Sequence, residues 1–189
     1  MKYFIISQPK AGTYLCANLL QEFNIGFEGL HFTLNKYQRY DLNNLEDCRK
    51  NRSKYSIKSP IQKSINQIKE NCVGVGHLGY SYETETLLKN FKKILLVRDQ
   101  VSCTRSWLKW TKITGKSANS ELITKGKRSS IENWKEKENV FVLNFYDMIN
   151  LNLDRLDDLQ NFLFDGVLYN SRLSINRALR KDSLTKVGR

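Results

Sequence analysis

Four short apolar runs alternate with segments of helical spacing along the chain, and this alternation sets the expected architecture. The runs lack the period of a helix and have the length of buried strands. They cover residues 3–7, 72–76, 93–97 and 140–144. Strands that alternate with helices predict a mainly parallel sheet covered by helices on both faces, which is an α/β fold of three layers (helix, sheet, helix).

Apolar residues recur every three or four positions in the segments between these runs, and each such segment is expected to form a helix. The segments are 13–23, 61–68, 83–91, 100–110, 131–137 and 151–163. Residues 24–58 are expected to be irregular with one short helix, 111–130 to form a mobile basic loop, and 173–189 to form a basic polar tail. We expect a single domain over 1–189, since no repeat or linker divides the chain.

Composition restricts the kind of partner. The formal net charge is +12, which favours an anionic partner such as nucleic acid, a phosphorylated cofactor, an acidic substrate or a membrane surface. A generally basic surface without such a partner is the alternative. No run approaches the ~20 apolar residues of a membrane span, and no leader pattern is present. The four cysteines lack C-x-x-C spacing, so no metal site is expected, and reduced thiols indicate a cytoplasmic protein.

The segment between the first strand and its helix has the composition of an anion-binding turn. Residues 8–12 include Pro9, which fixes φ, then Lys10, and Gly12, which permits close backbone approach; the helical pattern begins at Thr13. The N–H groups of the helix start and the Lys10 charge would converge on one anion. In a Walker A loop the lysine follows the second glycine, whereas Lys10 precedes Gly12. An ordinary strand–turn–helix junction is the alternative.

Polar residues follow the ends of three expected strands. Lys10 follows the first strand, His77 the second and Arg98 the third. Because ligands of parallel sheets bind at the carboxyl ends of the strands, these side chains are expected to converge on one site. A lone histidine after a strand is more often structural, and the combination with Lys10 and Arg98 is what favours a chemical role.

At these places the chain resembles the sulfotransferases that use PAPS (3′-phosphoadenosine 5′-phosphosulfate). Pro9–Thr13 resembles the family's 5′-phosphosulfate loop, and Gly76–Leu78 resembles the segment with its catalytic histidine. Lys93–Asp99 followed by Ser106 resembles the 3′-phosphate motif, in which a serine lies eight residues after a strand-end arginine. Thr185–Arg189 is similar to the family's late glycine motif.

The resemblance implies a P-loop NTPase-like fold and a role for each matched residue. The residues implied to hold the 5′-phosphosulfate are Lys10, Ala11, Gly12, Thr13 and Tyr14. Arg98 and Ser106 are implied to hold the 3′-phosphate, and His77 is implied to be the catalytic base. Two departures concern the same region: the family's serine in the loop is Ala11, and its sheet-end tyrosine aligns with Phe145 or Tyr146.

The residue types suit this chemistry without the family. Lys10 and the loop N–H groups can neutralise the charge that develops on the leaving phosphate. A neutral histidine such as His77 can remove the acceptor's proton, because an unperturbed imidazole has a pKa of about 6.5. Arg98 can bind a phosphate through its planar fork.

The sequence therefore predicts in-line transfer of a sulfuryl group from PAPS to a hydroxyl or amine of an unidentified acceptor, with no metal. The acceptor would be a small molecule, a glycan or a lipid, its pocket is expected from residues 24–60 and 111–130, and the oligomeric state is not indicated. Two alternatives remain open. One is another P-loop transferase, such as a small-molecule kinase, and the other is a non-catalytic basic protein that binds nucleic acid, which is not the expected partner.

Overall fold

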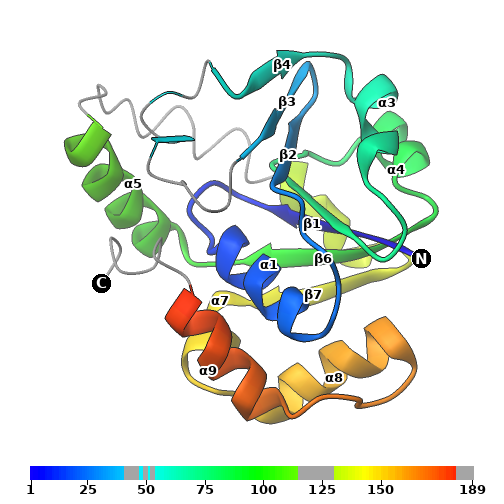
Figure 1. The fold of residues 1–189 in the computed structure, drawn as a ribbon, viewed down its shortest axis with the longest axis vertical. Coiled ribbons are helices and arrows are strands. Elements are labelled where there is room, and N and C mark those ends of the chain that lie inside the picture. Colours follow the sequence, from blue (N-terminus) through cyan, green and yellow to red (C-terminus); the bar gives the residue numbers. More distant parts are fainter. Residues whose placement is uncertain (41–46, 49–50, 52–53, 115–129, 182–189) are drawn as a thin grey trace.

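A seven-stranded sheet forms the centre of the molecule in this computed structural model, with the strands in the order β4-β3-β2-β5-β1-β6-β7 (Figure 1). The structure describes residues 1–40, 47–48, 51, 54–114 and 130–181. The strands are β1 (Lys2–Ser7), β2 (Leu30–Thr33), β3 (Lys36–Arg39), β4 (Ser56–Lys58), β5 (Val73–Gly76), β6 (Phe91–Val97) and β7 (Val140–Asn144). The α-helices are α1 (Thr13–Glu22), α3 (Ile61–Ser64), α4 (Tyr82–Leu87), α5 (Gln100–Thr114), α7 (Phe145–Ile149), α8 (Leu153–Phe164) and α9 (Ser171–Lys181), and the 3₁₀ helices are η1 (Ile65–Gln67) and η2 (Asn133–Glu136).

The sheet is mainly parallel, as the alternating pattern predicted. Strand β1 pairs in parallel with β5 on one side and with β6 on the other. Strands β2 and β7 extend the parallel part, while β3 and β4 add an antiparallel edge beyond β2. The carboxyl ends of β5, β1 and β6 therefore lie next to one another.

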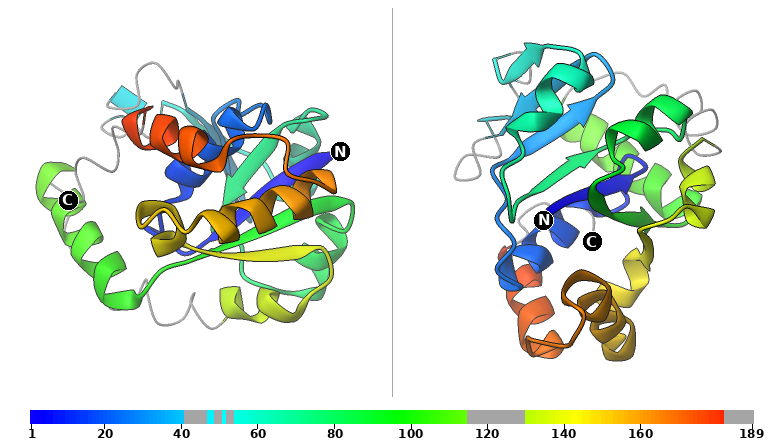
Figure 2. Two further views of the ribbon diagram at one scale, coloured as in Figure 1. Left: turned by 90° about the horizontal axis from the view of Figure 1, so that it is seen from below. Right: turned by 90° about the vertical axis from the view of Figure 1, so that its right-hand side faces the viewer.

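Side chains of β1 alternate between two hydrophobic clusters, one on each face of the sheet. Tyr3 and Ile5 pack into the cluster that contains the buried side chains of α1, α8 and α9. Phe4 and Ile6 pack into the other cluster, with α3, η1 and η2. Figure 2 shows these two groups of helices on opposite sides of the sheet, so the predicted three-layer arrangement is present.

Three predicted segments differ from the structure. The predicted irregular region 24–58 contains β2, β3 and β4; these strands are four residues or shorter, and β3 and β4 carry exposed charged residues, so neither has a strong apolar pattern. The predicted helix 83–91 ends with α4 at Leu87, and Phe91 instead begins β6 opposite Lys2. The segment predicted as a polar tail forms α9, and of its four buried residues (Ser171, Ser174, Ile175 and Ala178) only Ile175 is large and apolar.

The remaining predictions for this part of the chain stand as follows. The expected helix over 131–137 is present: residues 130–132 form an α-helical turn that continues into the 3₁₀ segment η2. Residues 115–129, which make up most of the expected basic loop, and 182–189, which carry the late glycine motif, lie outside the described residues.

All four cysteines are free thiols, and burial raises the pKa of Cys16 to about 12. None of the described helices is long and apolar enough to cross a membrane.

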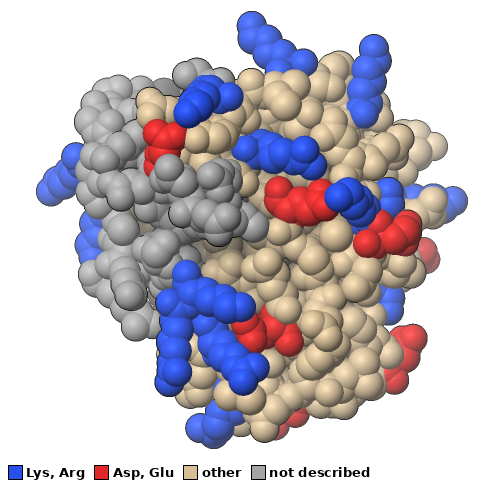
Figure 3. Space-filling view, viewed as in Figure 1, with Lys and Arg blue, Asp and Glu red and all other residues tan. Residues whose placement is uncertain are grey.

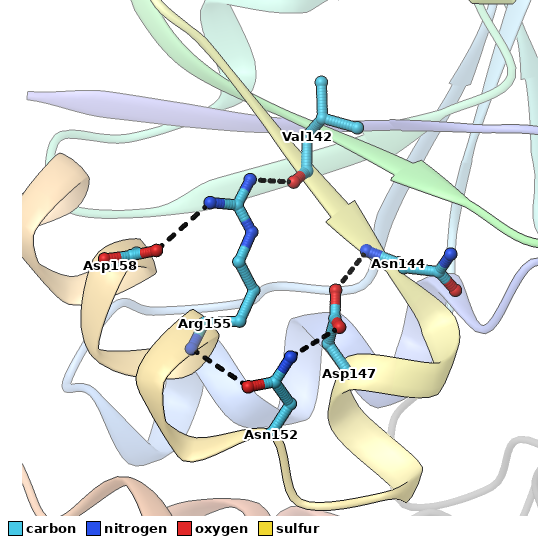
Figure 4. Close-up of polar contacts among 6 residues, drawn as sticks. All are labelled: Val142, Asn144, Asp147, Asn152, Arg155 and Asp158. Carbon is cyan, nitrogen blue, oxygen red and sulfur yellow. Dashed lines mark hydrogen bonds and ion pairs between the residues drawn. The ribbon is translucent and has the colours of Figure 1, made fainter.

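A polar junction fixes the chain where β7 passes into α7 and α8 (Figure 4). Asn144 caps α7 and, in return, its backbone N–H donates to Asp147 at 2.9 Å. Asn152 caps α8 and donates to Asp147 at 3.0 Å. Arg155 reaches back to the Val142 carbonyl at 2.6 Å. These bonds hold the end of β7, and with it Phe145, at the edge of the candidate site.

Candidate active site at the carboxyl ends of the strands

Three neighbouring parallel strands bring the predicted polar residues to one edge of the sheet. Strand β1 leads into the loop with Lys10, β5 ends just before His77, and β6 ends just before Arg98. The expected convergence at the carboxyl ends of the strands is thus present. It follows from the pairing of β5, β1 and β6, which the sequence alone did not specify.

The loop after β1 presents the start of α1 to this edge. The loop begins with a turn in which the Ala11 N–H donates to the Gln8 carbonyl at 3.2 Å. Lys10 has φ 68°, and Gly12, the N-cap of α1, has φ 98°. Because Gly12 has no side chain to cap the helix, the first N–H groups of α1 are oriented for an anion.

Three of the predicted cofactor-binding residues turn their side chains into the protein. Ala11 is fully buried, and the Thr13 hydroxyl is 2.7 Å from the Ser7 hydroxyl. The Tyr14 hydroxyl is 2.9 Å from Nδ1 of His31. These residues can therefore contribute to an anion site through backbone N–H groups.

Gly12 is packed against an aromatic ring, and a larger residue would not fit there. A Cβ at this position would lie 2.5 Å from Cδ2 of Phe145. We expect Gly12→Ala to lower the free energy of unfolding by about 2–4 kcal/mol, because left-handed φ and overpacking both oppose a side chain. The melting temperature should then fall by roughly 5–15 °C. Gly166→Ala is the matched control, since nothing lies within 4 Å of a Cβ there; equal melting temperatures for both variants would contradict this packing.

The Lys10 side chain extends towards α5. Its ammonium group lies 4.5 Å from the ring centroid of Trp110 and 5.7 Å from that of Trp107. Trp110 is buried, whereas Trp107 is half-buried. Cation–π attraction to the two rings thus holds the Lys10 side chain against α5.

Arg98 joins the end of β6 to the same loop. Its Nη1 donates to the Lys10 carbonyl at 3.1 Å, and its guanidinium lies 3.9 Å from the ring centroid of Phe145. In return, the Gln8 side chain of the loop donates to the backbone carbonyl of Arg98. The buried Nε of Arg98 has no hydrogen-bond partner among the described residues. Buried donors are nearly always satisfied in native proteins, so this N–H is a candidate contact for a ligand.

A pocket of about 420 Å³ opens beside Arg98, along the first turns of α5. The residues that line it are Arg98, Ser102, Arg105, Ser106, Leu108 and Lys109. Asp99 caps α5 by accepting from the Ser102 N–H at 2.8 Å. This bond, together with a bond from Tyr146, lowers the pKa of Asp99 to about 2. Arg98 and Ser106, which the resemblance to the 3′-phosphate motif paired, line the same pocket.

The geometry around His77 fixes which of its ring nitrogens can accept a proton. Nδ1 lies 2.8 Å from the backbone carbonyl of Ser7. A carbonyl oxygen only accepts, so Nδ1 carries the hydrogen of the neutral ring and Nε2 carries the lone pair. The Ser7 hydroxyl, 3.3 Å from Nδ1, connects this contact to Thr13 at the start of α1. Nε2 has the electronic state that a general base requires.

A second histidine, which the sequence analysis did not single out, lies against the first. The ring centroids of His31 and His77 are 4.8 Å apart in an edge-to-face arrangement. His31 is buried, and its bond to Tyr14 links it to α1. It lies on β2, where His31 pairs with Val75, two residues before His77. The sequence did contain a sign of this strand: Leu30, Phe32 and Leu34 alternate with polar residues around His31, within the region 24–58 that we expected to be irregular.

The described residues contain no group of three or more His, Cys, Asp or Glu side chains arranged to hold a metal ion. The positive charge of the site comes from Lys10 and Arg98, together with Arg105 and Lys109 of α5. The site can therefore bind a multiply charged anion, and the His77 imidazole and Arg98 follow the strands on either side of β1.

Comparison with known proteins identifies the fold. No protein-family model and no curated protein sequence matches the chain. The crystal structure of mouse sulfotransferase SULT7A1 complexed with PAP is similar, with TM-score 0.60 and 17% identity, over 98% of this chain and 65% of that chain. The sulfotransferase domain from the curacin biosynthetic pathway is similar as well, with TM-score 0.58 and 19% identity, over 96% of this chain and 77% of that chain.

The chain thus has the α/β sulfotransferase fold. It spans just under two thirds of the length of the mouse sulfotransferase. At identities below 20% the likeness concerns the arrangement of the strands and helices. The activity has to be argued from the residues of the site.

Proposed function

We propose that this protein transfers a sulfuryl group from PAPS to a hydroxyl or amine of an acceptor. The observation that carries the proposal is the convergence of three features on neighbouring strand ends of a sulfotransferase fold: the uncapped start of α1, Arg98 beside a cationic pocket, and His77 with its lone pair on Nε2. In the reaction, the acceptor oxygen or nitrogen forms a bond to sulfur as the bond from sulfur to the 5′-phosphate oxygen breaks.

The loop and Lys10 act on the leaving group. When the S–O bond breaks, negative charge grows on the 5′-phosphate. N–H groups at the start of α1 are held in position by the Gly12 turn, and Lys10 can supply a full charge from its place on the tryptophan rings. Preorganised charge of this kind is usually the largest contribution to such a transfer. These residues supply the positive charge, so the proposal needs no metal.

His77 acts on the acceptor. Its Nε2 takes the proton that the acceptor loses, while Nδ1 keeps its bond to the Ser7 carbonyl. That bond strengthens when the ring becomes an imidazolium, because a charged donor makes a stronger hydrogen bond. The backbone of β1 thus plays the orienting role that a carboxylate plays in other histidine bases.

Arg98 and Ser106 hold the 3′-phosphate in this proposal, with Arg98 donating through the Nε that the described residues leave without a partner. We expect Arg98→Ala to raise KM for PAPS by roughly ten- to a hundredfold, with a smaller effect on kcat, because a contact remote from the sulfur contributes mostly uniform binding. Arg98→Lys keeps the charge without the fork and should lose less. Steady-state kinetics with varied PAPS measure both constants. An unchanged KM together with a large loss in kcat would instead place Arg98 at the reacting sulfur.

The acceptor remains one of three classes, a small molecule, a glycan or a lipid, and the reaction is proposed to take place in the cytoplasm. Nucleic acid is not the proposed partner. Lysine and arginine side chains are spread over the face in Figure 3 and lie among acidic ones, rather than forming one continuous basic stripe. On α9, for example, Arg177 and Lys181 pair with Glu22.

The proposal is tested by incubating the protein with PAPS labelled with ³⁵S and a panel of phenols, glycans and hydroxylated lipids. We expect transfer of the label to one class, with release of PAP in equal amount. The same panel with ATP labelled at the γ-phosphate tests the kinase alternative. Label transfer from ATP, with none from PAPS, would overturn the proposal.

A further inference from the structure

The pocket beside Arg98 contains more positive charge than the proposed 3′-phosphate contacts use. Arg98 and Ser106 account for one cation and one hydroxyl. Arg105, Lys109 and the hydroxyl of Ser102 line the same space. A volume of about 420 Å³ is in the range of small-molecule sites and exceeds what one phosphate group fills.

The polar residues of α5 form one continuous patch. Arg105 and Ser106 are adjacent, and each lies three or four positions from both Ser102 and Lys109, so the four residues share one face of the helix. Residues at these spacings are surface neighbours, about 6 Å apart along the axis for the four-residue steps. The pair Arg105 and Lys109 places two like charges at the i,i+4 spacing, which is unfavourable for an isolated helix. A bound anion between them would remove that repulsion.

Arg98 alone is poorly suited to neutralise a phosphate dianion in this structure. One face of its guanidinium lies against Phe145, and Nη1 is bound to the Lys10 carbonyl. Its fork is therefore partly occupied in holding the loop. A terminal phosphate carries nearly two negative charges at neutral pH and offers three acceptor oxygens. Additional donors are needed, and α5 presents two of them in the same pocket.

We propose that Arg105 and Lys109 complete the 3′-phosphate site and determine the preference of this protein for a 3′-phosphorylated nucleotide. The inference rests on the proposed function, because it assigns these cations to the same donor. Both side chains are exposed, so they also attract the nucleotide from solution before Arg98 and Ser106 engage it. Arg105 and Lys109 thus supply positive charge to the phosphate, because part of the Arg98 guanidinium is already bound to the loop carbonyl of Lys10.

The test compares two nucleotides that differ only in the 3′-phosphate, PAP and AMP, by isothermal titration calorimetry at one ionic strength. The variants are Arg105→Gln and Lys109→Gln. The control is Lys112→Gln, which removes the same charge from an exposed position of α5 outside the pocket. All three positions are exposed, and melting temperatures without ligand verify that each variant is folded.

We expect each pocket variant to weaken PAP binding by about five- to twentyfold, the range for a partly screened charge-assisted bond. AMP binding should change less than twofold, so the ratio of the two dissociation constants falls. The control should leave that ratio unchanged. An unchanged ratio in both pocket variants, with wild type still preferring PAP, would overturn this inference and leave the proposed function intact. A wild-type protein that does not prefer PAP over AMP would overturn both.

Discussion

Replacement of Lys10 by alanine should reduce sulfuryl transfer from PAPS by about 10²–10³-fold while leaving the fold intact. Loss of one preorganised charge at a developing anion typically has this effect on turnover. The expected cost in stability is small, about 0.5–1 kcal/mol, because the substitution removes the cation–π attraction to Trp110 and Trp107, which is weak at a partly exposed site. Alanine and lysine have the same difficulty with the left-handed φ of 68°, so the backbone contribution cancels.

Single-turnover kinetics with saturating PAPS measure this effect, and thermal unfolding measures the stability. Lys36→Ala, at an exposed position of β3, is the matched control for loss of one positive charge. Near-normal turnover in Lys10→Ala would mean that the loop does not hold the phosphosulfate. A loss of stability much larger than in the control would instead assign Lys10 a structural role.

His77→Asn should lower turnover by about 10²–10⁴-fold and remove the acid limb of the pH–rate profile. Asparagine is the informative replacement because its amide N–H can retain the bond that Nδ1 makes to the Ser7 carbonyl at 2.8 Å. The variant therefore separates the base from the hydrogen bond. In wild type, activity should fall with decreasing pH, because protonation removes the lone pair of Nε2.

The profile is measured for both proteins with PAPS saturating, and PAP binding is measured for each. Retained turnover in His77→Asn, with the acid limb still present, would show that His77 only holds the loop to β1. Since the chain has two histidines, His31→Asn is the companion variant. It should keep the wild-type acid limb, because His31 is buried and bound to Tyr14.

The parallel core of the fold could be predicted because each of its strands contains a run of apolar residues. Strands β1, β5, β6 and β7 lie inside the sheet or against α8, so burial is encoded directly in runs such as 93–97. The edge strands could not be predicted, because β3 is held by pairing with β2 and β4 by pairing with β3, and both tolerate lysine and other polar residues. Helix α9 escaped detection because its apolar pattern is weak: of its buried residues Ser171, Ser174, Ile175 and Ala178, only Ile175 is large and apolar.

The residues of the candidate site likewise fall into those that the sequence could predict and those that it could not. Lys10, His77 and Arg98 follow strands that the apolar pattern reveals, so their convergence could be predicted. The neighbours of these residues could not. Phe145, which packs on Gly12 and under Arg98, and His31, which lies against His77, are brought in by β7 and β2 through sheet order alone. The resemblance to the 3′-phosphate motif paired Arg98 with Ser106, whereas Arg105 and Lys109, which line the same pocket, appeared as ordinary surface charges.

The central claim is that this site binds a nucleotide with a 3′-phosphate, and thermal unfolding with PAP and with ATP tests it most directly. A ligand that binds only the native state, present at a hundredfold excess over its Kd, stabilises the fold by about 2.7 kcal/mol. For a chain of this size that corresponds to a rise in melting temperature of roughly 5–10 °C with PAP. ATP lacks the 3′-phosphate and should give a clearly smaller rise at the same concentration. Equal shifts with PAP and ATP would contradict the account.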